Sequence, residues 1–151
     1  LSKQIQDRTV DKIYFAVLNG VPKNRQGTLK NYLKKDERTN TVKICPQYED
    51  GAKEAVLNYQ VLETKNGRSL VKIALETGRS HQIRVQFAGI NCPVVNDQKY
   101  GNQSEKGYLA LWATEIKFDH PVTKVRHTFR VPPPYDEGAW KDFNVARFLL
   151  V

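Results

Sequence analysis

Two apolar runs joined at Asn66-Gly67 place the strongest constraint on how this chain can fold. Residues 55–63 and 69–76 alternate apolar and polar side chains, with a short polar segment between them. Asn-Gly is characteristic of the tight turns that join antiparallel strands, because both residues tolerate positive φ. We therefore expect a β-hairpin here. Much of the core should come from Val56, Tyr59, Val61, Val71, Ile73 and Leu75.

Other segments extend this pattern. Further strands are expected at Val10–Leu18, Val42–Cys45, Tyr108–Phe118 (with one break in its alternation) and Val125–Val131. We expect the last turns of a helix at Leu1–Thr9, an irregular excursion with a short paired strand at Pro22–Asn40, and a closing helix marked by Trp140, Phe143 and Arg147. Strands outnumber helices and are joined by tight turns. We therefore predict one α+β domain over residues 1–151, with a mixed, mostly antiparallel sheet flanked by helices.

The charge balance narrows the class of protein. The 151 residues carry a formal charge of +8 and a pI of about 9.5, so the surface attracts polyanions. No apolar run approaches the roughly 18 residues needed to cross a bilayer, and no secretory signal pattern opens the sequence, so we expect a cytoplasmic protein. Cys45 and Cys92 lack the spacing of a metal site, and we expect neither a metal nor a cofactor.

A strand end, a glycine turn and a helix start follow one another in ETGRSHQIRVQFA, residues 76–88. Ser80 stands where an N-cap belongs, and Ile83, Phe87 and Ile90 recur at helical spacing. Four polar side chains crowd into six positions, namely Arg79, His81, Gln82 and Arg84. Free N–H groups at a helix N-terminus and positive charge suit an anionic ligand. The alternative interpretation is that both arginines are solvated surface charges.

Six segments, in one order, carry a family resemblance. They are KIYFAVLNG at 12–20, GAKEAVLNYQVLE at 51–63, TGRSHQIRVQFA at 77–88, NDQKYG at 96–101, LALWATEIKFDHPVT at 109–123, and Pro132 to Pro134 followed by Trp140 and Phe143. In these residues the sequence resembles the pseudouridine synthases of the ribosomal-large-subunit type, the RluA family, which isomerise uridine in structured RNA. Asn96 and Trp112 depart from the family pattern, which usually has glycine and often histidine at these places.

The resemblance implies roles for individual residues. Arg84, by its place in HQIR, matches the arginine that pairs with a catalytic aspartate; its guanidinium is a rigid fork that stays protonated. Tyr14, in YFAVLNG, matches an active-site tyrosine that packs beside the base and is a candidate for proton removal. Without the resemblance, Tyr14 is an ordinary core tyrosine. Arg79, His81 and Gln82 are the expected RNA contacts.

The family's nucleophilic aspartate is not recognisable in this chain. It belongs to an Arg-Leu-Asp segment upstream of the tyrosine strand, and nothing similar occurs in Leu1–Thr9. Asp7 and Asp11 lack that context, and Asp97 lies in the NDQKYG loop, a structural feature of the family. We therefore expect a C-terminal part of the catalytic domain, inactive by itself. Arg84 should then lack the carboxylate partner it has in the family.

The leading hypothesis is an RNA pseudouridine synthase domain that acts on ribosomal or transfer RNA as a monomer. The main alternative is a non-catalytic RNA-binding module with the same fold, and a third is a basic protein-interaction domain without an RNA role. The lysines of Pro22–Asn40 fit an RNA-facing surface and an ordinary solvated face equally well.

Overall fold

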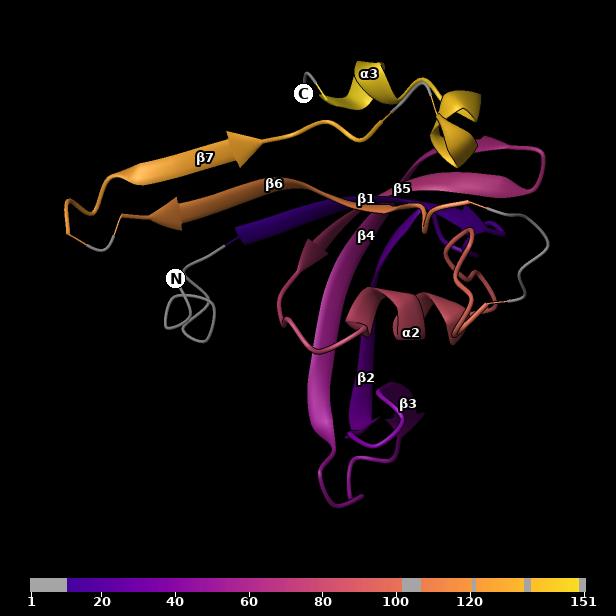
Figure 1. Cartoon of the computed structure of the whole chain (residues 1–151), viewed down its shortest axis with the longest axis vertical. Coiled ribbons are helices and arrows are strands. Elements are labelled where there is room, and N and C mark those ends of the chain that lie inside the picture. Colours follow the sequence, from indigo (N-terminus) through magenta and orange to yellow (C-terminus); the bar gives the residue numbers. More distant parts are fainter. Residues whose placement is uncertain (1–10, 102–106, 121, 135–136, 150–151) are drawn as a thin grey trace.

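Seven strands form one sheet, in the order β3-β2-β4-β5-β1-β6-β7 (Figure 1). The computed structural model describes residues 11–101, 107–120, 122–134 and 137–149, so the helical turns predicted at Leu1–Thr9 lie outside the described residues. The strands are β1 (Asp11–Asn19), β2 (Gln26–Asp36), β3 (Thr41–Cys45), β4 (Lys53–Lys65), β5 (Arg68–Leu75), β6 (Leu111–Asp119) and β7 (Arg126–Arg130). The helices are α2 (Gln82–Ala88), the 3-10 helix η1 (Gly138–Asp142) and α3 (Val145–Leu149).

All pairings between neighbouring strands in this sheet are antiparallel. This confirms the prediction of an α+β fold with a mostly antiparallel sheet. Within the described strands there is no parallel pair, so the expected mixed character is not found there. Helices lie on both sides of the sheet, with α2 on one side and η1 and α3 on the other (Figure 1).

The β4–β5 hairpin forms where the sequence predicts it. Asn66 and Gly67 both have positive φ, 53° and 77°, which lets the two strands meet in a tight turn. Along β4, alternate side chains from Ala55 to Val61 are buried, as expected for a strand with one face on the core.

The segment Pro22–Asn40 contains the expected paired strand, but that strand is long and the segment is not an irregular excursion. Eleven of its residues form β2, a long strand that pairs with β3 on one side and β4 on the other. Its many lysines are not typical of a strand. Strand propensity depends on the neighbouring strands, however, and one face of this part of the sheet is solvated. β2, β3 and the adjoining half of β4 form an arm that runs away from η1 and α3 (Figure 1).

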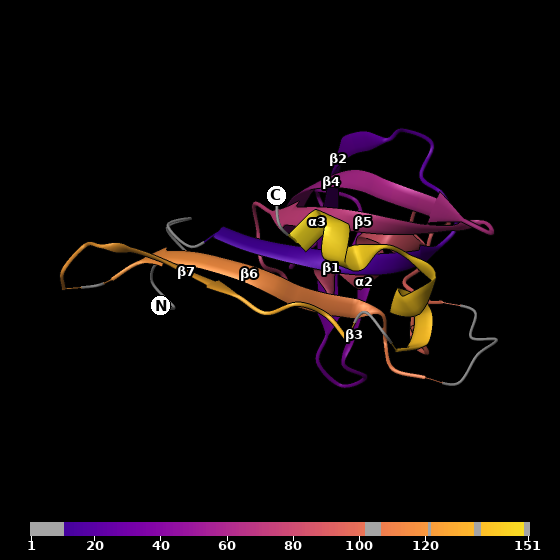
Figure 2. The same ribbon diagram turned by 90° about the horizontal axis from the view of Figure 1, so that it is seen from above.

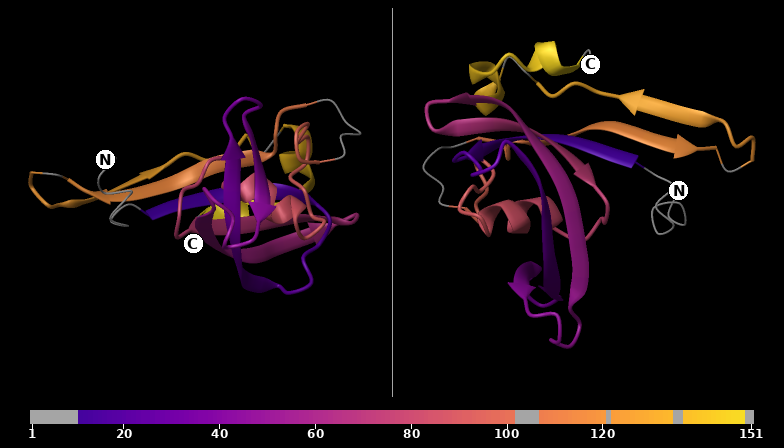
Figure 3. Two further views of the ribbon diagram at one scale, coloured as in Figure 1. Left: turned by 90° about the horizontal axis from the view of Figure 1, so that it is seen from below. Right: turned by 180° about the vertical axis from the view of Figure 1, so that it is seen from behind.

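The opposite end of the sheet also projects. β6 and β7 continue as a two-stranded ribbon beyond the other strands, as Figures 2 and 3 show from above and from behind. Thr114 is an extra residue opposite the Ile13–Tyr14 step of β1, which explains the predicted break in alternation.

The core lies between the sheet and its helices. On one side Phe87 of α2 meets Tyr59 of β4 edge to face, with ring centroids 5.6 Å apart. Trp140, Phe143 and Val145 complete the same core cluster from the C-terminal segment. The single closing helix that was expected is therefore two short ones, η1 and α3. No helix among the described residues is long and apolar enough to span a membrane.

Candidate active site

The turn between β5 and α2 is closed by a buried glutamine. Gln82 is 3% exposed, and its Oε1 accepts hydrogen bonds from Thr77 Oγ1 (2.8 Å) and from the backbone N–H of Arg79 (2.9 Å). Its Nε2 donates to the carbonyl of Val56 on β4 at 3.1 Å. Gln82 therefore holds the turn against the sheet. Its predicted role as an RNA contact is wrong, because its side chain is enclosed and occupied within the protein.

The helix does not begin as predicted. The N-cap is His81, in a left-handed conformation with φ 52°, and not Ser80. Two N–H groups of this corner are already used, since Arg79 N–H binds the Gln82 side chain and Gln82 N–H binds the Arg79 carbonyl at 3.1 Å. The expected anion site at a free helix N-terminus is therefore not formed by these groups. The exposed Arg79 side chain remains available, with its Nε bonded to the Glu54 carbonyl at 2.8 Å.

Arg84 has a carboxylate partner within this chain, although it is not the family's nucleophilic aspartate, whose absence stays a prediction. Its Nε and Nη2 donate to Asp97 Oδ2 and Oδ1, both at 2.9 Å. The side chain of Asp97 is 0% exposed, and that of Arg84 is 21% exposed. The loop after α2 folds back along the helix and brings together two residues that are 13 positions apart. Sequence spacing gave no sign of this pair.

Asp97 is held by more than the arginine. Its Oδ1 also accepts the backbone N–H groups of Lys99 and Tyr100, each at 3.0 Å. Burial raises the pKa of Asp97, but the hydrogen bond from Arg84, the two N–H groups and the arginine charge outweigh it, so the net pKa is below its usual range. The hydrogen bond to Asp97 in turn raises the pKa of Arg84. Both groups are therefore charged at neutral pH.

Tyr100 links this ion pair to His81. The Arg84 guanidinium lies 5.1 Å from the centre of the Tyr100 ring, and the Tyr100 hydroxyl is 2.7 Å from Nδ1 of His81. The same hydroxyl accepts the backbone N–H of Val42 on β3 at 2.9 Å. Burial lowers the pKa of His81, and the charges of Arg84 and two lysines add to this effect. His81 is therefore a neutral hydrogen-bonding group at neutral pH and not a cation.

Tyr14 lies on the same face of the sheet as α2. Residues directly opposite one another on paired strands point to the same face of the sheet. Tyr14 is opposite Ile73 on β5, and Ile73 is opposite Tyr59 on β4. The Tyr59 ring contacts α2, so all three side chains are on the α2 face. Tyr14 borders a groove of about 280 Å³ between β1, β6 and β7, lined also by Lys12, Ala113, Thr114, Glu115, Ile116, Phe129 and Val131. Burial raises the pKa of its hydroxyl. No described contact joins Tyr14 to Arg84.

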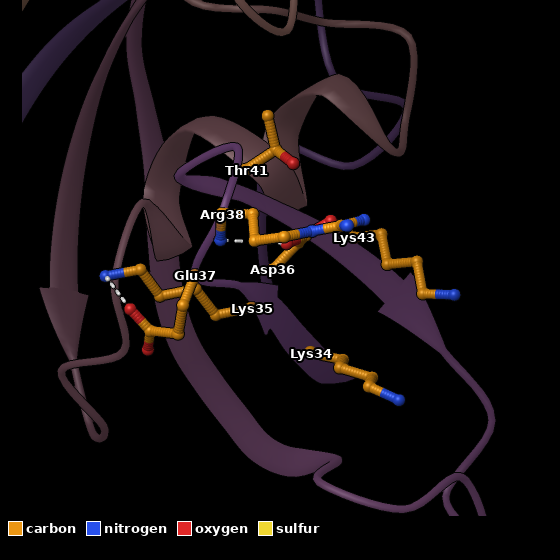
Figure 4. Close-up of a pocket in the computed structure, with 7 residues that line it drawn as sticks. All are labelled: Lys34, Lys35, Asp36, Glu37, Arg38, Thr41 and Lys43. Carbon is orange, nitrogen blue, oxygen red and sulfur yellow. Dashed lines mark hydrogen bonds and ion pairs between the residues drawn. The ribbon is translucent and has the colours of Figure 1, made fainter.

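Basic side chains line both faces of the arm. On the face toward the turn, a cavity of about 370 Å³ lies between the arm and Gly78–Ser80, and Lys35, Lys53 and Arg79 border it. A second cavity, of about 560 Å³, is lined by Lys34, Lys35, Asp36, Glu37, Arg38, Thr41 and Lys43 (Figure 4). Arg79 and the arm therefore adjoin one another, as the sequence could not show.

The predicted site residues thus fall into three groups. Arg79 and His81 lie at the turn beside the basic arm, and Arg84 lies in the first turn of α2. Tyr14 lies in a separate groove on the same side of the sheet. Sequence reasoning missed Asp97 and Tyr100 as parts of the site. The signal was the spacing within NDQKYG, which puts both residues in one turn, where the Tyr100 N–H meets the Asp97 carboxylate.

Solved pseudouridylate synthase domains share this fold of an antiparallel sheet flanked by helices. Human RNA Pseudouridylate Synthase Domain Containing 1 superposes with a TM-score of 0.75 at 25% identity, over 89% of this chain and 59% of that one. The domain-containing 4 protein gives a TM-score of 0.73 at 23% identity, over 88% of this chain and 61% of that one, which shows the shared fold.

The sequence profile of the RNA pseudouridylate synthase family matches residues 1–89, more than half of the chain. The chain belongs to the RNA pseudouridine synthases of the RluA family.

Similar curated proteins are larger than this chain. The RNA pseudouridine synthase YlyB of Bacillus subtilis is 38% identical over 141 residues, which cover 90% of this chain and 45% of YlyB. Ribosomal large subunit pseudouridine synthase D of Neisseria meningitidis serogroup B is 33% identical, over 90% of this chain and 39% of the relative. The chain thus spans about half the length, or less, of these relatives.

Proposed function

We propose that this chain is the part of a pseudouridine synthase catalytic domain that binds RNA and positions a uridine for isomerisation. The single observation that carries the proposal, beside family membership, is the fixed Arg84. Two of its nitrogens are held by the buried Asp97, and Nη1 takes no part in these bonds. A guanidinium fixed in this way is oriented before substrate binds, which is what a partner for a second, catalytic carboxylate requires.

The reaction needs groups that this site can supply. Uridine loses its N1–C1′ bond and gains a C5–C1′ bond; the proton leaves C5 and N1 gains a proton, so no cofactor is consumed. Tyr14 supplies an aromatic face for the base and a hydroxyl near C5, while Arg84 keeps the nucleophilic aspartate ionised. Asp97 cannot be that nucleophile, because its side chain is fully buried and both oxygens are occupied.

The aspartate is therefore expected on an Arg-Leu-Asp segment outside residues 1–151. The activity is proposed for the protein in which this chain is joined to such a segment. We propose ribosomal or transfer RNA as the substrate, a cytoplasmic location and a monomeric state.

RNA is proposed to bind across the turn and the arm. Lys35, Lys53 and Arg79 border one cavity there, and their charges suit backbone phosphates. His81 is neutral, so its proposed part is a hydrogen bond to RNA from the ring nitrogen that does not face Tyr100. This keeps Arg79 and His81 in the proposed RNA contact and leaves Gln82 out.

The test is to incubate the protein that contains this chain with ribosomal and transfer RNA and to map pseudouridine by carbodiimide adducts that stop reverse transcription. New stops are expected with wild type, and about 100-fold slower formation with Arg84→Lys or Tyr14→Phe. Arg147→Lys, on α3 on the opposite side of the sheet from α2, is the matched control and should behave as wild type. Residues 1–151 alone should give no stops. RNA binding without any stop, for the whole protein, would favour the non-catalytic module.

A further inference from the structure

A tyrosine is displayed at the end of the basic arm. Tyr48 lies in the segment 46–52 that joins β3 to β4, and it is 90% exposed. This segment lies at the end of the molecule farthest from η1 and α3 (Figure 1). An aromatic ring with so little contact contributes almost nothing to folding by burial.

The segment that carries Tyr48 is tied down on both sides. Glu49 N–H donates to the Pro46 carbonyl at 3.1 Å, and Ala52 N–H donates to the Glu49 carbonyl at 3.0 Å. The Glu49 carboxylate reaches back to the amines of Lys34 on β2 (3.7 Å) and Lys43 on β3 (3.4 Å). Tyr48 is therefore presented from a short turn anchored to two strands, so little order has to be gained when it binds a partner.

The two lysines face each other across the strands. Lys34 is directly opposite Lys43 in the β2–β3 register, so both side chains are on one face, and Figure 4 shows them extending toward the same side. Like charges in opposite positions repel, and among the described residues Glu49 is the carboxylate that forms ion pairs with them. These ion pairs are partly exposed and weak. An incoming phosphate would relieve the remaining repulsion.

We infer that Tyr48 stacks on an unpaired base of RNA while Lys34 and Lys43 contact the neighbouring phosphates. The inference rests on the proposed function, because RNA is the partner. A tyrosine flanked by cations is the combination that binds single strands, since every base offers a flat face and the backbone offers charge. A duplex keeps its bases stacked on one another and would use only the lysines.

The test measures binding of the protein that contains this chain to a fluorescein-labelled single-stranded oligoadenylate of about 12 nucleotides, by fluorescence anisotropy between about 50 and 200 mM KCl. Oligoadenylate has no uridine, so isomerisation plays no part. Tyr48→Ala should weaken binding by about 5- to 140-fold, the range for loss of one stacked base. Tyr48→Phe keeps the ring and should stay within about twofold of wild type.

Tyr108→Ala is the matched control, because Tyr108 is 94% exposed but lies outside the arm.

Lys34→Gln or Lys43→Gln should each lower the slope of log affinity against log salt by about 0.7, whereas Tyr48→Ala should leave it unchanged. The inference would be overturned if wild type and Tyr48→Ala bound the single strand equally. It would also be overturned if Tyr108→Ala lost as much affinity as Tyr48→Ala, or if Tyr48→Ala lost as much affinity for duplex RNA as for the single strand. Those results would leave uridine isomerisation standing, because that is measured by the reverse-transcription stops.

Discussion

Replacing Asp97 with asparagine should destabilise the fold and free Arg84. The substitution keeps the shape and one acceptor, so the N–H groups of Lys99 and Tyr100 can still bind Oδ1. The new amide N–H₂ takes the place of Oδ2 and faces the Nε–H of Arg84, donor against donor. One charge-assisted hydrogen bond is lost, and the guanidinium loses its counter-charge.

The magnitude follows from burial. Removing one partner of a fully buried ion pair costs about 3–5 kcal/mol, but Arg84 is 21% exposed and regains some hydration, so we expect a loss of about 2–4 kcal/mol. Urea unfolding followed by circular dichroism at pH 7 measures it. Arg130→Lys, on the exposed ribbon, should change the free energy of unfolding by less than about 0.5 kcal/mol.

The pH dependence provides a second check. The pKa of Asp97 is lowered in the folded state, so its contribution is complete above the unfolded pKa of about 3.9 and is lost as pH falls through the lower, folded value. The stability difference between wild type and Asp97→Asn should therefore be constant near neutrality and shrink below about pH 4. A difference of under about 0.5 kcal/mol at pH 7, or one that does not shrink in acid, would refute this reasoning.

Three further changes probe the elements that position the site. Gly67→Ala should lower the free energy of unfolding in urea by about 1–2 kcal/mol, because φ is 77° although a Cβ would meet no atom there. Gly78→Ala has equally open space and no positive φ, so it should be neutral. Equal effects of the two substitutions would contradict the turn argument. Gln86→Leu should lower the free energy of unfolding by about 1–3 kcal/mol, because the buried Gln86 amide donates to three acceptors on β2 and β4. An unchanged thermal midpoint would argue against that role. Gln82→Met should speed hydrogen exchange at the Arg79 N–H, and unaltered exchange would show that the glutamine does not hold the turn.

Local patterns in the sequence carried the prediction of most strands. The Asn66-Gly67 turn, the alternation in β4 and the break in β6 depend on residues close in sequence, so they could be read directly. The full length of β2 could not, because a lysine-rich strand is stabilised by the strands on either side of it and not by its own composition. The N-cap failed for a similar reason, since the Gln82 side chain completes the turn that Ser80 was expected to cap.

The sequence motifs determined the family and identified Arg84 and Tyr14 as candidate active-site residues, because a motif consists of residue types at fixed spacing. Only the tertiary structure decided what each residue touches. The return of the 93–101 loop over α2 gave Arg84 a buried partner, and the enclosure of Gln82 removed it from the proposed RNA contacts. Such contacts depend on the path of the chain between distant segments, and that path is fixed by packing and burial of the whole sheet, not by any single stretch of sequence.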